Sequence, residues 1–149
     1  LSSREEVCQA LNQMKDLSQT FLVEEMVTDT VTEVLLGFQN DQQFGLFLTL
    51  GAGGIYTELL EDTSVLLFPV SEDLIMDSLE SLKFFKIIQG WRGKPKGDLG
   101  ALVKAVLDFA RFAEHQHHKL VQAEINPLAI LPEGKGVKIL DALIEIKEN

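Results

Sequence analysis

The sequence contains little cysteine and few positive charges. Its single cysteine, Cys8, has no second cysteine in the chain with which to form a disulfide, which fits a reducing compartment and makes a cytoplasmic location the expectation. The 13 Lys and Arg residues are outnumbered by 23 Asp and Glu residues, which gives a net charge of −10. This balance argues against electrostatic binding of nucleic acid or of an anionic membrane. A phosphate ligand therefore has to be held by backbone amides, metal ions or groups supplied from elsewhere.

Long apolar runs are also absent. No run approaches the roughly 20 residues that a membrane-spanning helix requires, and the N-terminal stretch LSSREEVCQA has neither the basic nor the apolar region of a signal peptide. The sequence does have a globular composition, with 46% hydrophobic and 24% charged residues. A length of 149 residues is sufficient for one domain with a hydrophobic core. We therefore expect a single domain over residues 1–149.

Periodicity and turn signals predict an α+β fold. A capping box at Ser3 and Glu6 begins a helix that ends near Asp16, and its apolar face includes Cys8 as a core residue. Apolar runs then predict strands at 20–26, 33–39, 44–50 and 64–70. Because these runs are continuously apolar, we expect both faces of their antiparallel sheet to be covered.

The second half of the chain predicts helices and then strands. Helical spacing runs from Ser71 to Leu82 with a short continuation to Ile88, and again from Leu99 to about His115. A closing β-hairpin is predicted from VQAEI and LAIL (121–131), a turn at PEGKG, and VKILDALIEI (137–146). This order is typical of an α+β or mixed α/β domain.

The closing hairpin contains the most informative polar residues. Glu124 and Asn126 are two positions apart and point to the same face of their strand, while Asp141 lies on the strand after the turn. Two carboxylates and a carboxamide form an all-oxygen set suited to Mg²⁺. The alternative is that Asn126-Pro127 starts a turn and that Glu124 and Asp141 are exposed edge residues. Composition alone slightly favours this alternative.

Other clusters have competing interpretations. GAGGI (51–55) could form an anion-binding nest of backbone amides, although a tight turn is the more common role of such a cluster. VEEM (23–26) with Glu33 is either a solvated hairpin mouth or a hinge at which Glu24 meets an adenine and Glu33 a ribose. The loop from Trp91 to Lys96 is the one basic cluster, a solubilising loop or a contact to a partner or phosphate. Three histidines at 115–118 suit a helix C-terminus better than a metal site.

Taken together, several stretches in order resemble the ATP-grasp domain of NDP-forming acyl-CoA synthetases. They are FLVEEMV, TEVLLGFQNDQQFGLFLTLGAGGIYTELLED, WRGKPKGD and EINPLAI followed by VKILDALI. The resemblance covers about residues 1–146 and includes ADP-forming acetyl-CoA synthetase and, more distantly, the succinyl-CoA synthetase β subunit. It implies the second, C-terminal lobe of an ATP-grasp fold, a mainly antiparallel sheet covered by helices.

The resemblance also implies a phosphoryl relay. In this family an acyl phosphate passes its phosphoryl group to a histidine in another domain, and the ATP-grasp domain transfers it reversibly to ADP. By resemblance, Glu24, Met26, Val27 and Glu33 bind the nucleotide, Asn126 and Asp141 bind Mg²⁺, and Glu124 is the catalytic carboxylate near the phosphohistidine. Gly53, Gly54 and Glu58 match the family's Gly-Gly-x-x-x-Glu segment, for which contact with phosphate is one candidate role. Mg²⁺ and ATP or ADP are the implied cofactors.

The chain departs from the family pattern at its N-terminal side. The phosphate-binding lysine and flexible glycine loop of the first lobe have no counterpart here, and neither do the CoA-binding and phosphohistidine-bearing domains. We therefore expect a partial ATP-grasp domain that is inactive alone, needs those domains as partners, and exposes an apolar face open to homo-oligomerisation. One alternative is a regulatory, ligand-sensing module of a protein lysine acetyltransferase. Another is a structural interaction domain with a degenerate cleft.

Overall fold

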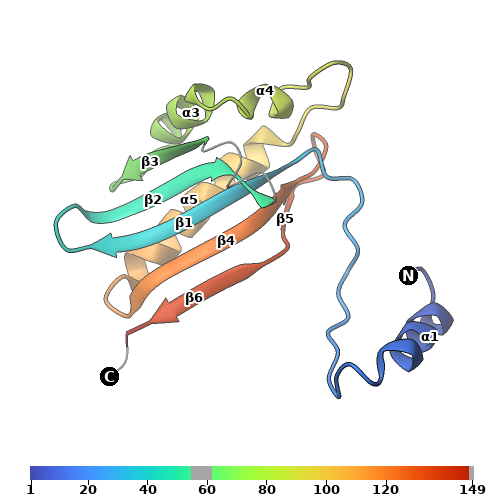
Figure 1. Ribbon diagram of the computed structural model, residues 1–149. Coiled ribbons are helices and arrows are strands. Elements are labelled where there is room, and N and C mark those ends of the chain that lie inside the picture. The colour runs from blue at the N-terminus through green and yellow to red at the C-terminus, as the bar shows by residue number, and fades with distance from the viewer. Residues whose placement is uncertain (55–61, 148–149) are drawn as a thin grey trace.

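The computed structural model describes residues 1–54 and 62–147. Its centre is a six-stranded sheet with strand order β3-β2-β1-β4-β5, in which β6 also pairs with β4 and every pair is antiparallel. Helices α3, α4 and α5 lie together on one side of this sheet (Figure 1). The elements in chain order are α1 (Arg4–Met14), β1 (Thr32–Asp41), β2 (Gly45–Ala52), β3 (Thr63–Leu67), α3 (Glu72–Ser81), α4 (Phe85–Ile88), α5 (Leu99–Gln116), β4 (Leu120–Ile130), β5 (Val137–Ile139) and β6 (Ala142–Ile146). The α+β prediction is confirmed.

Helix α1 stands apart from the sheet, and the chain after it returns to the sheet at β1 (Figure 1). The capping box begins the helix as predicted, since the Ser3 hydroxyl accepts a hydrogen bond from the Glu6 N–H at 3.2 Å. The strand predicted at 20–26 is wrong, because this segment pairs with no strand and instead lies along the apolar stripe of α1. The prediction of Cys8 as a core residue is also wrong, because α1 has no buried residue and Cys8 is exposed.

Strands of the sheet alternate between a packed face and an open face. On β1, Val34, Leu36 and Phe38 are buried against the helices, whereas Gly37 and Gln39 point to the opposite face. Among the described residues no helix covers that opposite face, so the expectation of two covered faces is wrong. The continuous apolar runs arise because strand side chains facing away from the helices are also often apolar.

Helix α5 supplies most of the contact with the packed face. The predicted stripe is confirmed, since Leu102, Val106 and Ala113 are fully buried. Asp98 caps the helix by accepting the Ala101 N–H at 3.1 Å. Burying each large aliphatic side chain of this interface contributes about 1.5–3 kcal/mol, so this layer fixes the sheet on which the candidate site lies.

The closing hairpin differs from its prediction in two ways. The two predicted strands at 121–131 form one strand, β4, in which a register shift places Asn126 and Pro127 opposite Leu35. The facing segment is broken into β5 and β6, and Asp141 lies in the break and not on a strand. A bulge of this kind re-aims side chains and interrupts pairing on both sides of it.

In the part of the chain that the structure describes, no helix has the length and apolarity needed to cross a membrane.

Candidate functional site

Asn126 is the polar centre of the candidate site. It lies half-buried in the β4 bulge, and its carboxamide makes two hydrogen bonds in opposite directions. The Oδ1 atom accepts from the Gly54 N–H at 3.0 Å, and Nδ2 donates to Oε1 of Glu124 at 3.2 Å. The expectation that Glu124 and Asn126 share a face is confirmed. Asn126 therefore connects the glycine segment after β2 to the carboxylate on β4.

The glycine pair 53–54 follows β2 and approaches the start of β1 closely. The Gly53 N–H donates to the Glu33 carbonyl at 2.9 Å, and a Cβ on Gly53 would lie 2.5–2.8 Å from the backbone of Val34. Gly54 has a φ of +62°, and a Cβ there would meet Oε2 of Glu33. Only glycine meets both requirements without strain. The pair thus places Glu33 and Asn126 on either side of one turn.

Asp141 reaches the same region through backbone pairing. The Asn126 N–H donates to the Asp141 carbonyl at 3.1 Å, and the Leu140 N–H donates to the Pro127 carbonyl at 3.0 Å. The exposed Asp141 carboxylate accepts the Ala142 N–H at 2.8 Å. These bonds hold the break between β5 and β6, and with it the backbone of Asp141, directly beside the bulge.

The oxygen atoms at this place suit a hard divalent cation. Glu124 and Asp141 provide carboxylates, and the Asn126 Oδ1 keeps a second lone pair beside its bond to Gly54. Within residues 1–54 and 62–147, no group of three or more His, Cys, Asp and Glu side chains could hold a metal ion. A Mg²⁺ ion at this place would therefore take most of its ligands from water and phosphate oxygens, as this ion commonly does.

A hollow lies beside β5 and is lined by the residues expected to bind the nucleotide base. It encloses about 380 Å³ and is lined by Glu24, Glu25, Met26, Val27, Lys138, Ile139 and Leu140. An ion pair between Lys138 and Glu25 holds the chain after α1 against β5. Because Asp141 directly follows the last lining residue, the hollow and the oxygen cluster are adjacent.

A groove of about 130 Å³ lies next to Glu124, on the face of the sheet away from α5. Its polar lining includes Gln39, Thr49 and Gln122, and the Gln122 side chain donates to Glu145 at 2.8 Å. Sequence reasoning missed these three residues. The two-residue spacing of Gln122, Glu124 and Asn126 was a signal that could have found Gln122.

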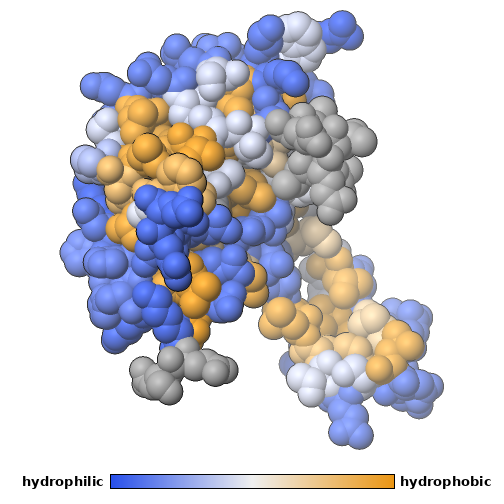
Figure 2. Space-filling view, turned by 60° about the vertical axis from the view of Figure 1, so that its left-hand side comes forward, coloured by the Kyte–Doolittle hydropathy of each residue, from blue (hydrophilic) through white to orange (hydrophobic). Residues whose placement is uncertain are grey.

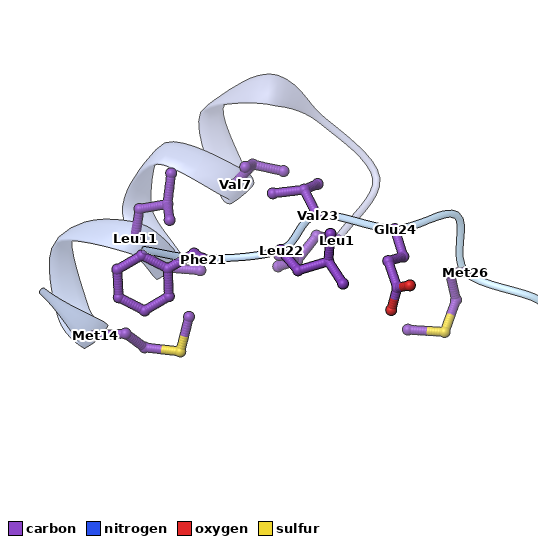
Figure 3. A pocket seen from close by; sticks show the side chains of 10 residues that line it. Leu1, Val7, Leu11, Met14, Phe21, Leu22, Val23, Glu24 and Met26 are labelled. Atoms are coloured by element: carbon purple, nitrogen blue, oxygen red, sulfur yellow. The ribbon is translucent and has the colours of Figure 1, made fainter. Parts of the chain in front are cut away.

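An apolar pocket of about 180 Å³ between α1 and residues 21–26 has a different character (Figure 3). Its lining is aliphatic and aromatic except for Glu24, which lies near the end of the row with Met26. In Figure 2 the part of the molecule that stands apart from the sheet shows an apolar area bordered by hydrophilic residues. The side chains of Leu22, Val23 and Met26 are exposed. Apart from Glu24, the pocket offers packing surface and no groups for chemistry.

The predicted site residues therefore occupy two adjacent places. Glu33, Gly53, Gly54, Glu124, Asn126 and Asp141 surround the β4 bulge, and Glu24, Met26 and Val27 line the hollow beside β5. Glu58 lies outside the described residues.

Comparison with known proteins gives the family. A sequence model described as the ATP-grasp domain matches residues 1–146. The chain belongs to the ATP-grasp family.

Two curated relatives of this ATP-grasp chain are ligases. It is 32% identical over 123 residues to an acetate–CoA ligase (ADP-forming) of Methanocaldococcus jannaschii, an alignment that covers 83% of this chain and 17% of the relative. It is 29% identical over 115 residues to the β subunit of acetate–CoA ligase (ADP-forming) II of Pyrococcus furiosus, covering 77% and 49%. This ATP-grasp chain thus spans less than half the length of either relative.

A solved structure has the same fold. This is dinucleotide-forming acetyl-coenzyme A synthetase 1 of Ca. Korarchaeum cryptofilum, in complex with coenzyme A and Mg-AMPPCP, with a phosphohistidine segment pointing towards the nucleotide-binding site. It superposes with a TM-score of 0.86 and 28% identity, covering 99% of this chain and 66% of that one.

Proposed function

We propose that this chain is the nucleotide- and Mg²⁺-binding part of an ADP-forming acyl-CoA synthetase. In this role it transfers a phosphoryl group between a phosphohistidine and ADP during reversible conversion of acyl-CoA, phosphate and ADP into acid, CoA and ATP. The observation that carries the proposal is the hydrogen-bond chain from Gly54 through Asn126 to Glu124, adjacent to the hollow beside β5. The ligase relatives and the Mg-AMPPCP complex of the structural neighbour support it.

The hollow beside β5 is suited to an adenine ring. Met26, Val27 and Ile139 provide apolar walls, and backbone groups of the extended segment 24–27 are available for the base edge. In this proposal Glu33 accepts hydrogen bonds from ribose hydroxyls. With the base in this hollow, the phosphates of the nucleotide extend towards Asn126 and Asp141.

The residues at the bulge position the reacting groups. When bound, Mg²⁺ neutralises charge that develops on the transferred phosphoryl group. Asn126 and Asp141 are its proposed ligands, and the Gly54 N–H fixes the Asn126 side chain in place. Glu124 is held by Asn126 at the edge of the groove on the open face, where its carboxylate can accept the other ring N–H of an incoming phosphohistidine and orient that ring.

The remaining groups of such a reaction come from partners. With a net charge of −10, this chain has an acidic surface, and the described site residues include no lysine or arginine apart from Lys138, which is paired with Glu25. Domains or subunits that bind CoA and carry the phosphohistidine complete the proposed enzyme. The relatives reported above are described as ligases, so the acetyltransferase-sensor alternative gains no support from them.

Calorimetric titration of Mg²⁺-ADP into the full chain tests the proposal. The Asn126→Ala variant should bind Mg²⁺-ADP at least tenfold more weakly, because it removes a proposed metal ligand and the hydrogen bond that holds Glu124. Asn40→Ala is the matched control, since Asn40 lies at the far end of β1 and bonds the His117 carbonyl. Equal binding by the Asn126→Ala variant and the wild type, or no binding by the wild type at any Mg²⁺ concentration, would contradict the proposal.

A further inference from the structure

The loop between α4 and α5 carries a basic surface that the proposed nucleotide site does not use. Residues 91–96 are all exposed and include Trp91, Arg92, Lys94 and Lys96. In a chain with 23 acidic and 13 basic residues, three cations within five positions form a local reversal of charge. Figure 1 shows this loop extending outward from the sheet between α4 and α5. We define these four residues as the Trp91 loop surface.

The tip of the loop presents its tryptophan and arginine together. The Arg92 guanidinium carbon lies 5.7 Å from the centre of the Trp91 ring, within cation–π range. Arg92 has a φ of 52°, a left-handed conformation that is uncommon for a non-glycine residue. Among the described residues it is the one non-glycine residue with a positive φ. Strain of this kind is concentrated at functional segments, which makes the loop a candidate for binding.

The base of the loop is held firmly on the fold. The Gly97 N–H donates to the Ile88 carbonyl at 2.8 Å, and the Glu133 N–H donates to the Lys96 carbonyl at 2.9 Å. Gly97 also packs so closely that a Cβ would lie 2.8 Å from Cγ2 of Ile130. The loop is therefore anchored on both sides, to α4 and to the turn after β4. A pre-ordered loop loses less conformational entropy when it binds a partner.

The positive charge continues beside the loop. Lys94 and Lys135 line a hollow of about 350 Å³ together with Pro95 and residues 28–31. Two acidic residues lie in this region. Asp29 is paired with Lys135 at 3.4 Å. Glu133 lies in the turn after β4, where its backbone N–H bonds the Lys96 carbonyl. The carboxylates of Asp29 and Glu133 form no ion pair with Arg92, Lys94 or Lys96 among the described residues.

We propose that the Trp91 loop surface is a docking site for an acidic segment of a protein partner. Tryptophan and arginine are the residues most enriched among those that dominate the energy of protein interfaces. Arg92, Lys94 and Lys96 together provide the electrostatic complement to carboxylates and would accelerate association. Nucleic acid and anionic membrane fit poorly, because the remainder of the acidic chain repels them. The site is independent of the proposed nucleotide chemistry.

The single tryptophan makes this surface directly measurable. Because Trp91 is the only tryptophan in the chain, its fluorescence reports on this loop alone. Titration of the full chain with a tryptophan-free poly-glutamate peptide should give a saturable change in emission that weakens with added salt. The triple variant Arg92→Ala, Lys94→Ala, Lys96→Ala should bind at least tenfold more weakly.

Three comparisons make the result decisive. A matched triple variant at Arg111, Lys119 and Lys147 removes the same charge from the opposite end of α5 and from the end of the sheet, and it should bind like the wild type. Equal weakening of both triple variants, or no fluorescence change with poly-glutamate, would overturn the proposal. Equal binding of a poly-glutamine peptide would also overturn it. Saturation by inorganic phosphate alone with the same affinity would show a small-anion site and not a protein-docking site.

Discussion

Replacing Gly53 by alanine tests the close contact that places the glycine pair. The added Cβ would lie 2.5, 2.7 and 2.8 Å from the C, O and N atoms of Val34, all of them backbone atoms of the central strand β1. A backbone contact of this kind cannot be relieved by a side-chain rotation. Overpacking in a well-packed region costs about 1–3 kcal/mol, and we expect a loss near the upper end, about 2–3 kcal/mol.

Thermal and urea unfolding measure this loss. For a chain of this size, 1 kcal/mol corresponds to about 2–4 °C in the unfolding midpoint, so Gly53→Ala should lower the midpoint by about 4–12 °C. Gly37→Ala is the matched control, because its Cβ would meet only Thr49 Cβ at an ordinary 3.6 Å. Both substitutions reduce the entropy of the unfolded chain similarly. Their difference therefore isolates the contact with Val34.

The two variants should differ in their free energy of unfolding. Gly37→Ala should unfold within about 1 kcal/mol of the wild type. If Gly53→Ala unfolds at the same midpoint as Gly37→Ala, the turn after β2 does not approach β1 as closely as described. The hydrogen bond from Gly53 to the Glu33 carbonyl would then not define the site.

Three further substitutions test other parts of the fold. Asp62→Ala should lower the free energy of unfolding by about 2–4 kcal/mol in urea titrations, because the buried carboxylate accepts two backbone N–H groups at the start of α4 that would lose their partner. Backbone N–H donors, first that of Gly136 and then that of Ala101, hold the pKa of Asp98 below its usual value. The stability this provides is complete above the unfolded-state pKa and is lost as pH falls through the folded-state pKa. Asp98→Asn should therefore remove part of the fall in thermal midpoint measured below about pH 4. Lys138→Ala breaks an exposed ion pair with Glu25 and should change stability by less than about 1 kcal/mol, yet weaken Mg²⁺-ADP binding in calorimetry if that pair shapes the hollow beside β5.

Local sequence signals predicted the helices, because their apolar faces and their first residues are marked within their own sequence. The helices from Leu99 and after Ser71 were marked by apolar residues at helical spacing, and α1 by a capping box that the structure confirms. The segment 20–26 has strand-like composition, but strand formation also requires a partner strand, which composition cannot specify. Its side chains pack on α1 instead. The prediction failed where a long-range contact decided the outcome.

The candidate site depends on such long-range contacts more than the core does. The two-residue spacing of Glu124 and Asn126 fixed their common face in advance, but nothing local indicated that Gly54, 72 positions away, would donate to Asn126. The break at Asp141 likewise lies beside the bulge of β4, a long-range neighbour that local sequence does not specify. A bulge leaves polar backbone and side-chain groups outside the regular ladder, and here Asn126 and Gly54 satisfy one another. The irregularity that local sequence does not predict therefore lies at the place where we propose that Asn126 and Asp141 bind Mg²⁺.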